Sequence, residues 1–190
     1  GGWLVAAILA AGASPESTGA ERYDADLASG RVTVEGTSTI HDWTVEGQII
    51  RGGLILHELE PSSLWTHGDA APQALAATVH VEIPVDSLKS DNSGLNRRMY
   101  EALKAKTHPT ITYRLESAKI TTRQIAQTDE AGGSLTIETT GVLMVASVER
   151  TVDMPIHVRR LSENRLEISG DTALRMTEFD IDPPRAMLGT

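Results

Sequence analysis

Apolar and polar residues alternate along most of the chain from Arg31 onward, which is typical of β-strands with one buried face. The clearest stretch is 78–85, where Val79, Val81 and Ile83 alternate with polar neighbours. The same alternation recurs in the segments 32–35, 111–115, 135–145, 152–159 and 166–176. The pattern predicts about eight antiparallel strands, most of them joined as hairpins.

Clusters of Gly, Ser and Asn separate these segments and favour chain reversals between neighbouring strands. They lie at Ser29–Gly30, Gly52–Gly53, Ala131–Ser134 and Ser162–Asn164. Between Glu58 and Gln73 the chain is rich in Pro, Ser, Ala and Gly, and we expect this insertion to form no strand.

In one segment the apolar residues recur at helical spacing instead, and these are Leu95, Met99 and Ala102. Asn92 or Ser93 can cap the start of a helix here. The helix should end before Pro109, because the residue ahead of a proline disfavours helical backbone. The sequence therefore predicts one short helix near residues 93–105.

An antiparallel sheet of this length has edges to protect, and closure into a barrel is the usual solution. The interior of an eight-stranded barrel has room for side chains or for one slender ligand. Few aromatic residues are available to fill it, since the chain has one Phe, three Trp and three Tyr. We therefore expect an all-β barrel with aliphatic walls; the periodicity does not decide whether side chains or a guest fill the lumen.

Composition narrows the possible functions. The chain has 190 residues, enough for a single domain with its own core. Its net charge of −9 argues against a nucleic-acid binder, which needs a cationic surface. It has no cysteine, which excludes a thiolate metal site, a cysteine nucleophile and a disulfide framework.

The N-terminus carries the pattern of a secretory signal. The apolar run Trp3–Ala11 is too short to cross a bilayer and leads into Ala11-Gly12-Ala13, with a second small-residue site at Thr18-Gly19-Ala20. We expect residues 1–20 to be a partial signal peptide with a linker, residues 21–190 to be one domain, and the protein to be periplasmic. The alternative is a buried N-terminal helix. We interpret the apolar end Ala186–Thr190 as that of a C-terminally truncated fragment.

A set of motifs, in order, resembles the YceI-like family over residues 23–190. The motifs are Val34–Trp43, Val81–Leu88, Leu95–Tyr113 with Thr107-His108-Pro109, Gly141–Ile156 and Met176–Pro184. Ser147 and Asp180 replace glycines common in the family, and Glu178 replaces an Asp. Non-glycine residues at positive φ would be strained there, although Asp tolerates it best. Family members continue past Gly189 into one more strand, so we expect a gap or an unpaired edge in the wall.

The resemblance implies an all-β, lipocalin-like barrel that binds a polyisoprenoid chain, such as a quinone tail or a prenyl lipid, in its lumen. An apolar tube needs no catalytic group for this task, so we expect no enzyme, no cofactor and no metal. By parity the expected wall residues are Val79, Val81, Ile83, Ile111, Tyr113, Leu143, Val145, Met154, Ile156, Leu174 and Met176, joined by Trp43 and Met99.

Other functions have weaker support in the sequence. No pair of histidines has metal-ligand spacing, and no nucleophile motif such as G-x-S-x-G occurs. His41 beside Asp42 is the best polar candidate, either as a structural hydrogen bond or as the base of a hydrolase. An interaction protein is the third class, with the 58–73 loop or an open edge recruiting a partner or a second copy, so that monomer and homodimer both stay open.

A local excess of positive charge lies around the predicted helix. Against Asp91 and Glu101, the segment 89–106 holds Lys89, Arg97, Arg98, Lys104 and Lys106. This surface could make transient contact with anionic lipid headgroups or could simply be a solvated helix face.

Overall fold

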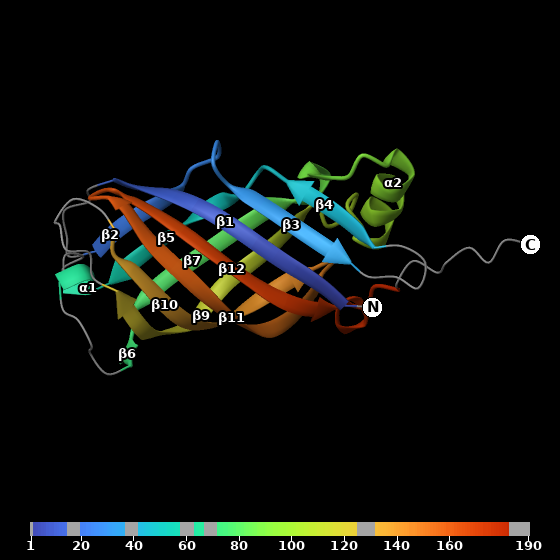
Figure 1. Ribbon diagram of the computed structural model, residues 1–190. Coiled ribbons are helices and arrows are strands. Elements are labelled where there is room, and N and C mark those ends of the chain that lie inside the picture. Colours follow the sequence, from blue (N-terminus) through green and yellow to red (C-terminus); the bar gives the residue numbers. More distant parts are fainter. Residues whose placement is uncertain are drawn as a thin grey trace, which may run out of the picture.

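The computed structural model describes residues 2–14, 20–36, 42–57, 63–66, 72–124 and 132–182, and for residues 2–14, 63 and 66 it describes the backbone only. The strands wrap around a common interior, with a short helix at either end (Figure 1). The strands are β1 (Gly2–Ser14), β2 (Ala20–Ala25), β3 (Arg31–Gly36), β4 (Trp43–Gly47), β5 (Arg51–His57), β6 (Gln73–Ala74), β7 (Ala77–Pro84), β8 (Leu88–Lys89), β9 (Thr110–Gln124), β10 (Ser134–Val145), β11 (Val148–Ser162) and β12 (Arg165–Arg175). The helices are α1 (Ser63–Thr66), α2 (Ser93–Ala102) and the 3₁₀ turns η1 (Val85–Ser87) and η2 (Met176–Phe179).

Several of these strands are halves of longer ones. β2 and β3 follow one another along the same edge of β1. β5 and β4 pair with them in turn, and β7 and β8 pair with β5 and β4. Counted this way the wall consists of β1, β2–β3, β4–β5, β7–β8, β9, β10, β11 and β12, every neighbouring pair antiparallel. The predicted all-β antiparallel architecture of about eight strands is confirmed.

The expected gap beside the last strand is absent, because β1 occupies that position. One edge of β1 pairs with β12, from Gly2 opposite Arg175 to Gly12 opposite Arg165. Its other edge pairs with β3 and then with β2. These N-terminal residues are therefore a strand and not the helix that we considered as an alternative, while their role as an export signal stays a prediction.

Two of the predicted reversals are wrong, because in both places the chain continues along the wall in the same direction. Ser29–Gly30 lies between the collinear strands β2 and β3, and Gly52–Gly53 lies inside β5. At Gly52, φ is +120°, and a Cβ there would overlap the backbone carbonyl oxygen of His80 on β7. Glycine here permits a bend and a close approach between strands instead of a turn.

The other local predictions agree with the structure. The Asn92 side chain caps α2 by accepting a hydrogen bond from the Leu95 N–H at 3.0 Å. The tight β10–β11 turn places Ala146 and Ser147 at φ values of 50° and 74°, and Asp180 adopts a φ of 54°. Positive φ therefore occurs at the positions where the family has glycine. Most of the 58–73 insertion lies outside the described residues; its described part holds the one-turn helix α1, and Gln73 begins the short strand β6.

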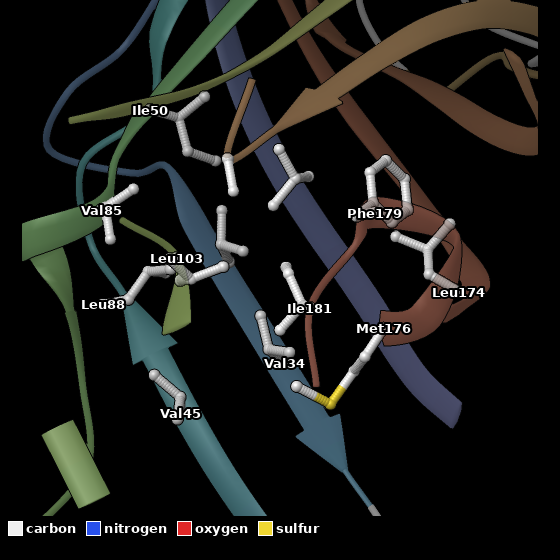
Figure 2. Close-up of a cluster of buried hydrophobic side chains, with 13 residues drawn as sticks. Val34, Val45, Ile50, Val85, Leu88, Leu103, Leu174, Met176, Phe179 and Ile181 are labelled. Atoms are coloured by element: carbon white, nitrogen blue, oxygen red, sulfur yellow. The ribbon is translucent and has the colours of Figure 1, made fainter. Parts of the chain in front are cut away.

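Two clusters of buried apolar side chains occupy the interior. One lies beside α2 and the other beside α1, and these helices lie at opposite ends of the barrel (Figure 1). The α2-end cluster, which Figure 2 shows as sticks, is Val32, Val34, Val45, Ile50, Val85, Leu88, Leu103, Val145, Ala146, Leu174, Met176, Phe179 and Ile181. The α1-end cluster is Tyr23, Leu56, Leu64, Trp65, Ala118, Ile120, Leu135, Ile137, Val158 and Leu166.

Candidate functional site

Strand register identifies which side chains face the interior between the two clusters. Cross-strand partners point to the same face of a sheet, so the buried Ile137 directs its partners Ile120 and Ile156 inward as well. The same reasoning applies to the row Val81, Tyr113 and Leu143 across β7, β9 and β10. We call the resulting set the central band: Leu54, Val79, Val81, Ile83, Ile111, Tyr113, Leu115, Leu143, Val152, Met154, Ile156 and Ile168.

The central band is packed less completely than either end. All of its members are only partly buried, although their side chains point toward the axis of the barrel. The two end clusters, in contrast, are buried. The side chains of the band are therefore covered less completely than those of the two end clusters.

Two inward-facing glycines shape this region. A Cβ on Gly141 would lie 2.5 Å from the Tyr113 ring, so the ring occupies the space over that glycine. A Cβ on Gly170 would lie 2.8 Å from Cγ2 of Ile156 and 3.4 Å from Cγ of Met154. The absence of side chains at both positions lets larger neighbours lie flat against the wall.

The polar atoms within the band are satisfied by the wall itself. Thr139, a buried residue of β10, donates a hydrogen bond from Oγ1 to the Met154 carbonyl oxygen at 2.6 Å. The Tyr113 hydroxyl lies 3.3 Å from the same Oγ1 and donates to it, since the threonine proton is already engaged. Burial is the main cause that raises the pKa of Tyr113. Tyr113 is therefore neutral at ordinary pH. Its hydroxyl is engaged by Thr139, and its ring forms part of the apolar wall.

The α1 end contains a group of polar side chains that sequence reasoning missed. Glu21 lies opposite the buried Leu56 and, like Tyr23, points inward. Arg160 lies opposite the buried Leu166 and places its guanidinium 6.0 Å from the centre of the Trp65 ring. The available signal was that Glu21 lies two residues from the apolar Tyr23 and so shares its face of the strand. This pair precedes the segment in which alternation is clear.

The predicted wall residues divide between the band and the α2 end. Val79, Val81, Ile83, Ile111, Tyr113, Leu143, Met154 and Ile156 belong to the central band. Val145, Leu174 and Met176 are buried in the α2-end cluster, and Trp43 and Met99 pack against it. The Trp43 ring covers Gly36, its partner across β3 and β4.

The other candidates show no assembled site. His41 lies outside the described residues, and Asp42 is exposed. Within the described part of the chain, no three His, Cys, Asp or Glu residues gather to hold a metal ion. The cations around α2 are all exposed: Lys89, Arg97, Arg98, Lys104 and Lys106. None of the described helices has the length and apolar character needed to span a bilayer.

Comparison with known proteins decides the family. The model of the YceI-like domain matches residues 23–189, which is most of the chain. The chain belongs to the YceI-like family. The resemblance in the ordered motifs is thereby confirmed.

One solved structure similar to this YceI-like chain is described as a polyisoprenoid binding domain from Saccharophagus degradans implicated in plant cell wall breakdown. The TM-score is 0.46 at 10% sequence identity, over 90% of this chain and 96% of that one. None of the curated proteins compared with the chain matches it significantly.

Proposed function

We propose that this chain holds one polyisoprenoid chain, such as a prenyl lipid or a quinone tail, along the central band. The observation that carries the proposal is the set of aliphatic side chains that face the interior and yet are not fully covered. Each methylene transferred from water to such a surface contributes about 0.8 kcal/mol, so one isoprene unit contributes on the order of 3 kcal/mol before the costs of binding. A few units suffice for retention.

In this proposal the protein sequesters or transports its lipid and performs no chemistry. The resemblance to the YceI-like family implies binding, and the polar atoms of the central band are already engaged within the wall. Periplasmic localisation is part of the same proposal and is supported by the signal-like run Trp3–Ala11.

The direct test is to purify the full chain, extract it with organic solvent and analyse the extract by mass spectrometry. We expect one isoprenoid per protein, or its uptake when a polyprenol is added to delipidated protein. Neither a bound isoprenoid nor uptake of added polyprenol would overturn the proposal.

Substitutions in the band test the location of the lipid. Leu143→Trp and Ile83→Trp each add bulk to the interior face, and we expect both to lower lipid loading strongly. Val142→Trp is the matched control, because it adds the same side chain to the outer face of β10. Normal loading of both interior variants would place the lipid elsewhere.

A further inference from the structure

The α1 end of the interior holds a carboxylate that the protein only half satisfies. Glu21 enters the interior from β2, opposite the buried Leu56, and lies two residues from Tyr23, which is 2% exposed. Burial is the main cause that raises the pKa of Tyr23, and a hydrogen bond that its hydroxyl donates to Glu21 adds to the rise. The second carboxylate oxygen, Oε2 of Glu21, is buried and has no hydrogen-bond partner among the described residues.

The nearby cation, Arg160, does not pair with this carboxylate oxygen. Arg160 on β11 is close enough to Tyr23 to act on its hydroxyl electrostatically, yet no ion pair joins it to Glu21. Its guanidinium lies over the ring of Trp65 instead, an arrangement that stabilises a cation against an aromatic face. The arginine therefore offsets the negative charge at this end while leaving Oε2 available.

An unpaired carboxylate oxygen in a buried site is costly, and natural proteins seldom retain one without a reason. A hydrogen-bond donor supplied by a guest would remove that cost. The position is suited to such a guest, because Glu21 and Tyr23 lie among the α1-end cluster, and Ile156 and Ile168 of the central band pack against that cluster. A chain lying along the band would thus end beside the cluster that surrounds Glu21 and Tyr23.

We propose that Glu21 Oε2 accepts a hydrogen bond from the head group of the bound lipid, and that the preferred guest is therefore an isoprenoid ending in a neutral donor, a hydroxyl above all. This inference rests on the proposed function and adds an orientation of the lipid to it: the head group lies at the α1 end and the tail extends toward the α2 end. An isoprenoid diphosphate is disfavoured, because its negative charge would face the Glu21 carboxylate.

The test compares three ligands with the same isoprenoid chain on the full-length, delipidated protein: a polyprenol, its methyl ether and its diphosphate. The ether retains the tail and the oxygen but lacks the donor. We expect the alcohol to bind about tenfold more tightly than the ether, the effect of one hydrogen bond to a charged acceptor. We expect the diphosphate to bind more weakly than the alcohol.

Glu21→Leu should bring the ratio of alcohol to ether affinity close to one while leaving the affinity for the ether within about twofold of wild type. Unchanged ether binding also shows that the variant is folded and its lumen intact. Glu138→Leu is the matched control, since Glu138 is exposed on β10, and it should retain the wild-type ratio.

The outcomes distinguish failure of the head-group assignment from failure of the proposed lipid-binding function. Equal binding of alcohol and ether by the wild type, tighter binding of the diphosphate, or a wild-type ratio in Glu21→Leu would overturn the head-group assignment and leave the lipid function standing. Failure of all three ligands to bind would overturn both.

Discussion

The two ends of the barrel interior are closed by different kinds of side chain. At the α2 end the cluster consists only of apolar residues. It includes Leu103 directly after α2, Phe179 at the end of η2, and Ile181 just beyond it. At the α1 end, Tyr23 and Trp65 share the space with the charged groups of Glu21 and Arg160. One end is therefore packed like an ordinary core, and the other includes charged and hydroxyl groups among its apolar side chains.

In the proposed function, this difference separates stability from recognition within one continuous wall. Close apolar packing contributes most of the free energy of folding, whereas unpaired polar atoms cost free energy and are retained where they orient a ligand. Substitutions at the two ends should therefore differ in sign as well as in size.

The largest effect is expected at the α2 end. Phe179→Ala removes a buried ring, and we expect a loss of about 3 to 4 kcal/mol in the free energy of unfolding, because the surroundings cannot fill the cavity. Urea titration followed by circular dichroism measures it. Leu27→Ala is the control: Leu27 is 58% exposed, so its loss should be below about 0.5 kcal/mol. Similar values for both variants would show that the α2 end is not a packed core.

At the α1 end we expect the opposite sign. The double variant Glu21→Leu/Tyr23→Phe replaces both hydrogen-bonding partners by apolar groups, and it should raise the free energy of unfolding of the lipid-free protein by roughly 1 kcal/mol. The same urea titration reports it. Glu21→Leu alone should gain less, since it leaves the Tyr23 hydroxyl unpaired. A loss of stability in the double variant would mean that the carboxylate is already satisfied.

Alkaline pH should act through the buried tyrosines. Burial, with Glu21 beside it, raises the pKa of Tyr23, and burial raises the pKa of Tyr113. Unfolded tyrosines release their protons near pH 10 while the folded ones keep them, so this contribution to stability is present below about pH 10 and is lost as the pH rises further. Tyr23→Phe should flatten the fall, measured by unfolding at pH 9 to 11. An unchanged slope would argue against a buried Tyr23.

The smallest effect concerns the exposed cations at the α2 end. Exchanging Arg97 and Arg98 for Gln should leave the free energy of unfolding within about 0.5 kcal/mol. If the helix contacts anionic membranes, the same variant should sediment less with vesicles containing phosphatidylglycerol, and added salt should weaken the wild-type interaction. Equal, salt-independent sedimentation of both proteins would assign these residues to a solvated face.

Much of the wall could be predicted from the sequence, because a period of two reports directly which side chains share a face. Val81, Ile83 and Leu143 were assigned inward from parity alone, and the register agrees. Parity does not report how far along the barrel a residue lies. Leu174 and Met176 have the expected parity but are buried at the packed end.

The remaining differences arise where local chemistry has two outcomes. A glycine pair such as Gly52–Gly53 permits either a reversal or a bend within a strand, and the partner β7 decides between them. The run Trp3–Ala11 is apolar throughout, so it has no alternation from which a strand could be inferred. The partnership of Glu21, Tyr23 and Arg160 joins strands from opposite ends of the sequence and has no local signature.

The position of β1 limits how the N-terminal segment could be processed. Withdrawing this strand would leave β12 and the β2–β3 edge facing one another across a slot roughly 10 Å wide, each with a row of unpaired amides and carbonyls. The same residues cannot both depart with a cleaved leader and hold the seam shut. A processed molecule would have to recruit another extended segment into the slot before its wall could close again.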